Sequence, residues 1–142
     1  MLDKASIREL TMQNLQRFEE EGLKGSKLSI RKYETMLHIK SYFAQNHFDW
    51  FDLPESEIIQ HLKNIKGIGH WMIDMILLYT FGFPDVFPID DYHVKIMMNT
   101  IYAEHAAGLT KKQRRSISDR WSPYRSLAFY ALIDYKNTNP RP

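Results

Sequence analysis

The chain has 142 residues, a length typical of one domain, and its hydrophobic fraction of 44% is enough for a packed core. Its formal net charge is only +2, so a role in binding nucleic acid would depend on where the cations lie. The absence of cysteine excludes disulfides, zinc held by cysteine and iron–sulfur clusters bound by thiolates of this chain. The charged, amphipathic start is no secretory signal, and no apolar run approaches the roughly 18 residues that span a membrane, so we expect a soluble cytoplasmic protein.

Two helices are predicted in the first third of the chain. Apolar residues at helical spacing predict the first over residues 6 to about 20. Ser29 is a suitable N-cap for the second, which we expect from Ile30 to Gln45. The spacing places three of its side chains on an inward face: Tyr33, Leu37 and Phe43.

A third and a fourth helix follow, separated by a glycine-rich turn. An aromatic loop ends at Pro54, which suits the first turn of the third helix. That helix stops at the turn Lys66-Gly67-Ile68-Gly69, and the fourth begins at about His70. The fourth helix is apolar nearly all round, which predicts burial in the middle of a helical bundle.

The last part of the chain contains a loop and three more helices. Gly82, Pro84 and Pro88 break the chain before a fifth helix, whose apolar side is formed by Val94, Met97, Met98, Ile101 and Tyr102. Thr110 caps a basic sixth helix, and a last helix runs from Tyr124 to about Tyr135. No segment alternates with period two, so the predicted class is all-α, with one domain over residues 1–142.

The glycine turn can bind an anion. Two helices joined by a short turn leave backbone N–H groups unpaired at the start of the second helix, and these donors suit a phosphate. Lys63 and Lys66 flank the turn and would attract a polyanion. The alternative is a plain helix end, which a lone Gly-x-Gly more often marks.

Two adjacent carboxylates, Asp90 and Asp91, stand directly before the fifth helix. One of them can be its N-cap. A second reading is a hard-cation site formed with His93, although nothing nearby completes the ligand shell. A third is acid–base or electrostatic catalysis by one carboxylate in an aromatic pocket.

The stretch LKNIKGIGHWMIDMILLYTFGFPDVFPIDDYHVKIMM resembles the helix–hairpin–helix DNA glycosylases, in the 3-methyladenine glycosylase II branch that removes alkylated bases. The frame GIGHW, then PDVFP, then DDY has the order and spacing of that branch, and so does RWSPYRSLA downstream. LSIRKY is similar to the element that precedes the hairpin. The resemblance covers about residues 28–132, and its motifs are specific jointly. It implies a helical bundle with the helix–hairpin–helix at about 54–81 and a catalytic loop at 82–91.

The resemblance also implies a role for each matching residue. The hairpin would hold a backbone phosphate of double-stranded DNA through its main-chain N–H groups, often with a monovalent cation on its carbonyls. Asp91 matches the catalytic aspartate. Trp71 and Tyr92 match aromatic positions near the flipped base, and we assign Met75 to the base pocket with them. The Tyr92-His93 pair and Met75 lie where relatives vary, which leaves the preferred base open. The hairpin residues are Ile65, Lys66, Gly67, Ile68 and Gly69.

Trp71 occupies the position where bifunctional relatives carry a lysine nucleophile, so the chain looks monofunctional. The implied reaction is hydrolysis of the glycosidic bond of an extruded base, and it requires no metal or organic cofactor.

One departure from the family affects this interpretation. The family begins with further helices carrying a Gln-Gln-x-Ser-like motif, and nothing like it precedes Ser29. The chain is then a fragment, a natural short form, or one that needs a second chain or another copy of itself to cover the missing face. The alternatives to an enzyme are a non-catalytic DNA-binding module and an interaction protein without DNA affinity.

Overall fold

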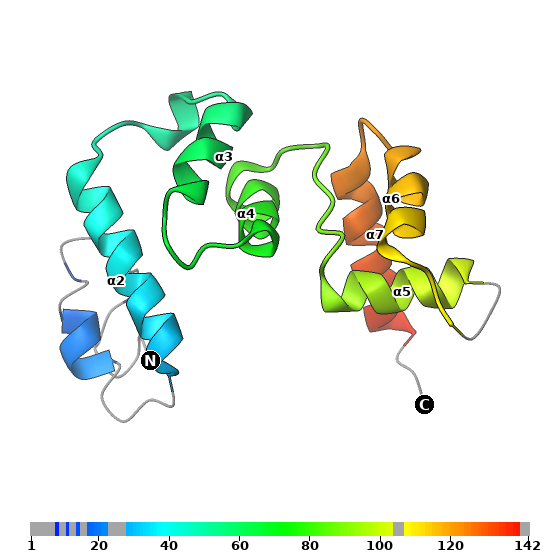
Figure 1. Cartoon of the computed structure of the whole chain (residues 1–142), viewed down its shortest axis with the longest axis horizontal. Helices are drawn as coiled ribbons and strands as arrows, with labels where there is room; N and C mark the ends of the chain where they lie inside the picture. Colours follow the sequence, from blue (N-terminus) through cyan, green and yellow to red (C-terminus); the bar gives the residue numbers. More distant parts are fainter. Residues whose placement is uncertain are drawn as a thin grey trace. The chain divides into compact units, whose positions relative to one another are not determined.

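The computed structural model describes residues 8, 11, 14, 17–22, 28–103 and 107–139. Within them the regular elements are helices and there is no strand, which confirms the all-α class. The chain divides into two compact units, Met1–Ile68 and Gly69–Pro142, and each is described by itself (Figure 1). Whether both form the single domain expected from the sequence stays a prediction. No helix in the described part is long and apolar enough to cross a membrane.

The first unit contains the helix α2, Ile30–Gln45, with the predicted bounds. Ser29 caps it as expected, because its Oγ accepts a hydrogen bond from the backbone N–H of Lys32 at 3.4 Å. A short π-helical turn, η2, spans Phe18–Gly22. Most of the helix that we predicted over residues 6 to about 20 lies outside the described residues.

An aromatic cluster joins α2 to the 3₁₀ turn η3, Trp50–Asp52, and to α3, Glu55–Lys63. Phe43 stacks on Trp50 with ring centroids 5.2 Å apart, and the Phe48 and His61 rings are 4.3 Å apart. The Tyr42 hydroxyl is 2.6 Å from Nδ1 of His61. The cluster therefore anchors α3 to the C-terminal end of α2.

The inward face that we assigned to α2 is partly wrong. Tyr33 and Leu37 are 40% and 39% exposed, and α2 contains no buried residue. Helical spacing identifies an apolar stripe, but it does not say whether another element covers it.

The second unit begins with α4, His70–Ile76, which continues into a π-helical turn, η4, over Leu77–Phe81. The predicted start at His70 is confirmed, and Gly82 ends the segment in the left-handed conformation, with φ of 68°. Our prediction of burial all round is wrong. One side is buried, but Trp71 and Tyr79 are 45% and 61% exposed.

The remaining helices are α5, Tyr92–Tyr102, α6, Lys111–Asp119, and α7, Arg125–Thr138. Helix α5 packs against α7 (Figure 1). Their buried side chains include Val94, Met97, Met98, Phe129 and Leu132.

Two details of these helices can be compared with the sequence. The predicted cap of α6 is confirmed as a full capping box between Thr110 and Gln113. Ile101 and Tyr102, which we expected on the apolar side of α5, are 44% and 42% exposed.

Candidate active site

Asp91 is the N-cap of α5. Its Oδ1 accepts hydrogen bonds from the backbone N–H groups of His93 at 2.8 Å and Val94 at 3.1 Å. Its side chain is nearly buried, with 8% of the residue exposed. These bonds satisfy two donors of the first helical turn, and they fix the carboxylate at the start of a rigid element.

The second carboxylate oxygen of Asp91 is held by a tryptophan from another helix. Nε1 of Trp71 donates a hydrogen bond to Oδ2 of Asp91 at 2.9 Å. The two residues are 20 positions apart, and the bond ties the first turn of α4 to the first turn of α5. Asp91 therefore accepts three hydrogen bonds, and both of its carboxylate oxygens have a donor.

The other two predicted pocket residues are placed differently. Met75 is half-buried, one turn after Trp71 on α4. Tyr92 follows Asp91 on α5, is 68% exposed, and packs edge-on against His93 with ring centroids 5.4 Å apart.

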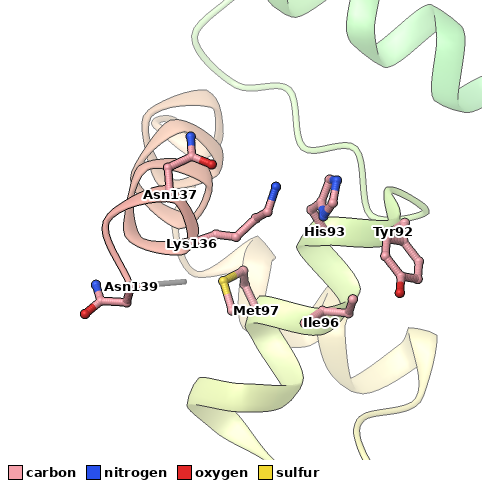
Figure 2. Close-up of a pocket in the computed structure, with 7 residues that line it drawn as sticks. All are labelled: Tyr92, His93, Ile96, Met97, Lys136, Asn137 and Asn139. Carbon is pink, nitrogen blue, oxygen red and sulfur yellow. The ribbon is translucent and has the colours of Figure 1, made fainter. Parts of the chain in front are cut away.

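Tyr92 and His93 also line a hollow of about 510 Å³ between the start of α5 and the end of α7. Figure 2 shows Lys136 extending from α7 toward His93 above Met97. The hollow adjoins the pair of Trp71 and Asp91 through His93, whose backbone N–H donates to Oδ1 of Asp91. The structure thus brings Trp71 and Asp91 together, and Tyr92 borders the hollow between α5 and α7.

Asp90 has a different environment from its neighbour. Its Oδ2 lies 2.6 Å from Nζ of Lys111 at the start of α6, and both side chains are about half exposed. No group of three or more His, Cys, Asp or Glu side chains in the described residues is arranged to hold a metal ion.

Two ionisable residues near the site were missed by the sequence interpretation. Burial raises the pKa of Asp74 on α4 to about 6, and the nearby charge of Asp90 contributes to the rise while His70 opposes it. Burial also raises the pKa of Tyr79, and Tyr130 and the charge of Asp91 add to this effect. A lone acid within the apolar stretch 70–81 was the available signal for Asp74.

The boundary between the two units lies within the predicted hairpin, between Ile68 and Gly69. On the first side Ile65 is buried and accepts a hydrogen bond from the Ile68 N–H at 3.1 Å. Gly67 has φ of +99°, and a Cβ there would lie 2.3 Å from Oγ1 of Thr35 on α2. Both the backbone conformation and the close approach of α2 require glycine at position 67.

Gly69, on the second side, is the N-cap of α4, with φ of −98° and ψ of 171°. A Cβ there would meet nothing within 4 Å, and no side chain caps the helix. Lys63 and Lys66 are exposed. The start of α4 therefore offers backbone donors that neighbouring side chains do not cover.

The sequence of this chain is similar to those of known DNA-3-methyladenine glycosylases. The chain is 26% identical over 125 residues to DNA-3-methyladenine glycosylase 2 of Escherichia coli (strain K12), covering 87% of this chain and 40% of the relative. It is 27% identical over 127 residues to the DNA-3-methyladenine glycosylase of Bacillus subtilis (strain 168), covering 84% and 40%. No protein-family model matches.

The fold is also similar to a solved structure. The crystal structure of a DNA-3-methyladenine glycosidase from Bacillus halodurans superposes with a TM-score of 0.73 at 23% identity, covering 94% of this chain and 63% of that one. The chain spans about two fifths of the length of the curated relatives described above.

Proposed function

We propose that this chain, a member of the helix–hairpin–helix DNA glycosylase superfamily in its 3-methyladenine II branch, acts in base-excision repair as a monofunctional N-glycosylase on double-stranded DNA. Its reaction is hydrolysis of the glycosidic bond of alkylated bases such as 3-methyladenine. The observation that carries the proposal is the carboxylate of Asp91, nearly buried and held on both oxygens at the start of α5.

The chemistry needs a fixed negative charge more than it needs a base. A positively charged alkylated base is a good leaving group once it has been extruded from the duplex, and positive charge then develops on the sugar. A carboxylate that is already oriented stabilises that charge without reorganising during the reaction. The three donors on Asp91 supply this orientation.

The exposed aromatic face of Trp71 suits an electron-poor base. An alkylated base carries positive charge, and cations bind well over the face of an indole ring. Trp71 is 45% exposed while its N–H is bonded to Asp91, so its ring can contact the base beside the carboxylate. Met75 and Tyr92 are the further residues that we assign to the base pocket. No amine stands at position 71, which supports a monofunctional enzyme.

The hairpin supplies the contact with the DNA backbone. We assign one phosphate to main-chain N–H groups of the hairpin Ile65–Gly69, in which those of Ile65 and Ile68 already donate to the carbonyls of Leu62 and Ile65. Lys66 adds positive charge, and a monovalent cation can sit on the hairpin carbonyls. The open space at Gly69 supports this assignment, because a phosphate can approach the backbone there closely.

We further propose that a second chain or another copy of this one covers part of the second unit. Its support is the exposure of several large side chains there that the proposed base pocket does not use, among them Tyr79, Tyr124 and Leu127. Large exposed apolar patches are uncommon on monomers, so a partner that covers side chains of this type is expected. Sedimentation as a monomer at every concentration would contradict this part of the proposal.

A paired assay tests the function. The intact chain is mixed with methylated duplex, and base release under single-turnover conditions is measured beside a gel shift with the same DNA. Release of alkylated bases supports the glycosylase. Binding without release supports a non-catalytic DNA-binding module, and the absence of both supports a protein without DNA affinity.

A further inference from the structure

The loop that leads to Asp91 is bound to the first turn of α7 through Ser126. The Ser126 hydroxyl donates to the carbonyl of Phe83 at 2.6 Å, and it accepts a hydrogen bond from the N–H of Val86 at 3.0 Å. Ser126 is 5% exposed. One buried hydroxyl therefore holds two points of the loop, which are three residues apart.

A second attachment lies beside the first. Nε and Nη2 of Arg125 donate to the two carboxylate oxygens of Asp85 at 2.7 Å and 2.9 Å, and the hydroxyl of Ser122 adds a bond at 2.9 Å. This bidentate geometry is stronger and more directional than a single ion pair. The hydrogen bonds from Arg125 also hold the pKa of Asp85 below its usual value.

The loop in turn caps α7. The N-cap residue of this helix, Tyr124, makes no side-chain capping bond. Oδ1 of Asp85 accepts from the backbone N–H of Arg125 at 3.3 Å, and the carbonyl of Pro84 accepts from that of Ser126 at 3.0 Å. Moving the loop would leave the first donors of α7 without these partners.

The remaining link to Asp91 is short and stiff. Val86 and Ile89 are 6% and 7% exposed, and Pro88 is also buried. The N–H of Asp91 donates to the carbonyl of Pro88 at 2.8 Å, and that of Ile89 to Phe87 at 2.8 Å. A displacement at residues 83–86 would therefore reach Asp91 within a few residues.

We propose that Arg125 and Ser126 are positioning residues for the proposed reaction: from the first turn of α7 they fix the loop 83–88, and through it the orientation of the Asp91 carboxylate toward the substrate. They do not touch the substrate themselves. The inference rests on the proposed function, so its test includes a measurement that does not need catalysis.

The test compares Ser126→Ala, Arg125→Lys and Asp85→Asn with wild type in the full chain. Ser118→Ala is the matched control for Ser126→Ala, because Ser118 is also buried but donates to the Arg115 carbonyl within its own helix, α6. Arg17→Lys is the control for Arg125→Lys, because Arg17 forms an exposed ion pair with Glu21 in the first unit. Circular dichroism shows which variants fold. Arg125→Lys and Asp85→Asn each test the contribution of the Arg125–Asp85 pair, so one folded variant of the two is enough.

Two measurements decide the outcome. We call Ser126→Ala, Arg125→Lys and Asp85→Asn the loop variants, because each removes a contact that holds the loop. Their single-turnover release should fall by about 10²-fold, because a small misplacement of a catalytic group has an effect of that order. The DNA affinity of these three variants should equal that of wild type. The two control variants should release the base at the wild-type rate. In parallel, NMR of the Trp71 indole N–H, assigned with Trp71→Phe, should show slow hydrogen exchange in wild type and faster exchange in the loop variants.

Folded loop variants that keep both the wild-type release rate and slow indole exchange would overturn the proposal. If wild type releases no base, the proposed function fails, while the indole signal still tests the positioning. Exchange that speeds up in the loop variants but not in Ser118→Ala then supports it, and unchanged exchange rejects it.

Discussion

The glycine turn and the loop before Asp91 lie at the two ends of one stretch of sequence, yet they are built in opposite ways. At the turn, Gly67 fits closely against Thr35, while Gly69 opens the start of α4 with nothing near it. Around the loop, Asp85 within it, Ser126 on α7 and Asp91 at its end each make three or more hydrogen bonds. In our proposal the turn supplies backbone donors to a phosphate, and the polar contacts around the loop hold one carboxylate still.

The largest expected effect is at the end of the loop. Asp91→Asn keeps the shape of the side chain and removes its charge, so single-turnover release from methylated duplex should fall by about 10²–10⁴-fold. Binding to the same DNA should persist, because phosphate contacts at the turn do not involve Asp91. Asp90→Asn is the matched control, since Asp90 pairs with Lys111 instead. Equal rates for wild type and Asp91→Asn would remove Asp91 from the mechanism, and a collapse in Asp90→Asn alone would transfer the role to Asp90.

The second prediction separates the two glycines of the turn. Gly67→Ala should lower the free energy of unfolding by about 1–3 kcal/mol, because alanine is strained at positive φ and its Cβ would overlap Thr35. Gly69→Ala should leave thermal stability nearly unchanged, since its φ of −98° is ordinary and the space is open.

When equal amounts of folded protein are compared, DNA affinity should be reduced more by Gly69→Ala than by Gly67→Ala. Gly69→Ala should weaken binding to every sequence alike, because a methyl group would obstruct the backbone donors that a phosphate approaches. If a folded Gly69→Ala variant binds DNA as wild type does, the turn is not the anchor.

The third prediction concerns the hydrogen bond between Trp71 and Asp91. Trp71→Phe keeps an aromatic face and removes the N–H, so one oxygen of Asp91 loses its donor. We expect release to slow by about 10-fold through poorer positioning of the carboxylate. Trp50→Phe is the control, because Trp50 belongs to the aromatic cluster of the first unit. A Trp71→Phe variant with the wild-type release rate would show that the indole N–H does not help to hold the catalytic carboxylate.

The sequence predicted the helices better than their exposure. Caps and breakers at Ser29, Gly69, Gly82 and Thr110 lie where the structure has helix ends, because these signals are local. The exposure of Tyr33 and Tyr79 depends on which elements cover them, and periodicity does not contain that information.

The same limit applies to the site. The family motif selected Trp71 and Asp91, but their hydrogen bond and the contact of Gly67 with Thr35 join residues 20 and more positions apart. The attachment of Asp85 to Arg125 spans 40 positions, so the motif around Arg125 could be recognised without its role being visible.

The smallest expected effect belongs to Asp74, on the helix that leads from the turn toward the loop. Its pKa is raised to about 6, chiefly by burial, so the folded protein binds a proton there that the unfolded chain releases near pH 4. Between about pH 4 and 6 the folded state holds more protons, and its stability therefore falls as the pH rises through this window. The loss levels off about one pH unit above the folded-state pKa of about 6.

Asp74→Asn should remove that dependence and raise the free energy of unfolding at pH 7 by about 1 kcal/mol or less, since the side chain is partly exposed and water screens its charge. Urea unfolding of both proteins from pH 4 to 7.5 measures it. Parallel curves for wild type and Asp74→Asn would mean that this carboxyl titrates normally. A difference that grows with pH would show that ionisation of Asp74 on α4 opposes folding, as its raised pKa requires.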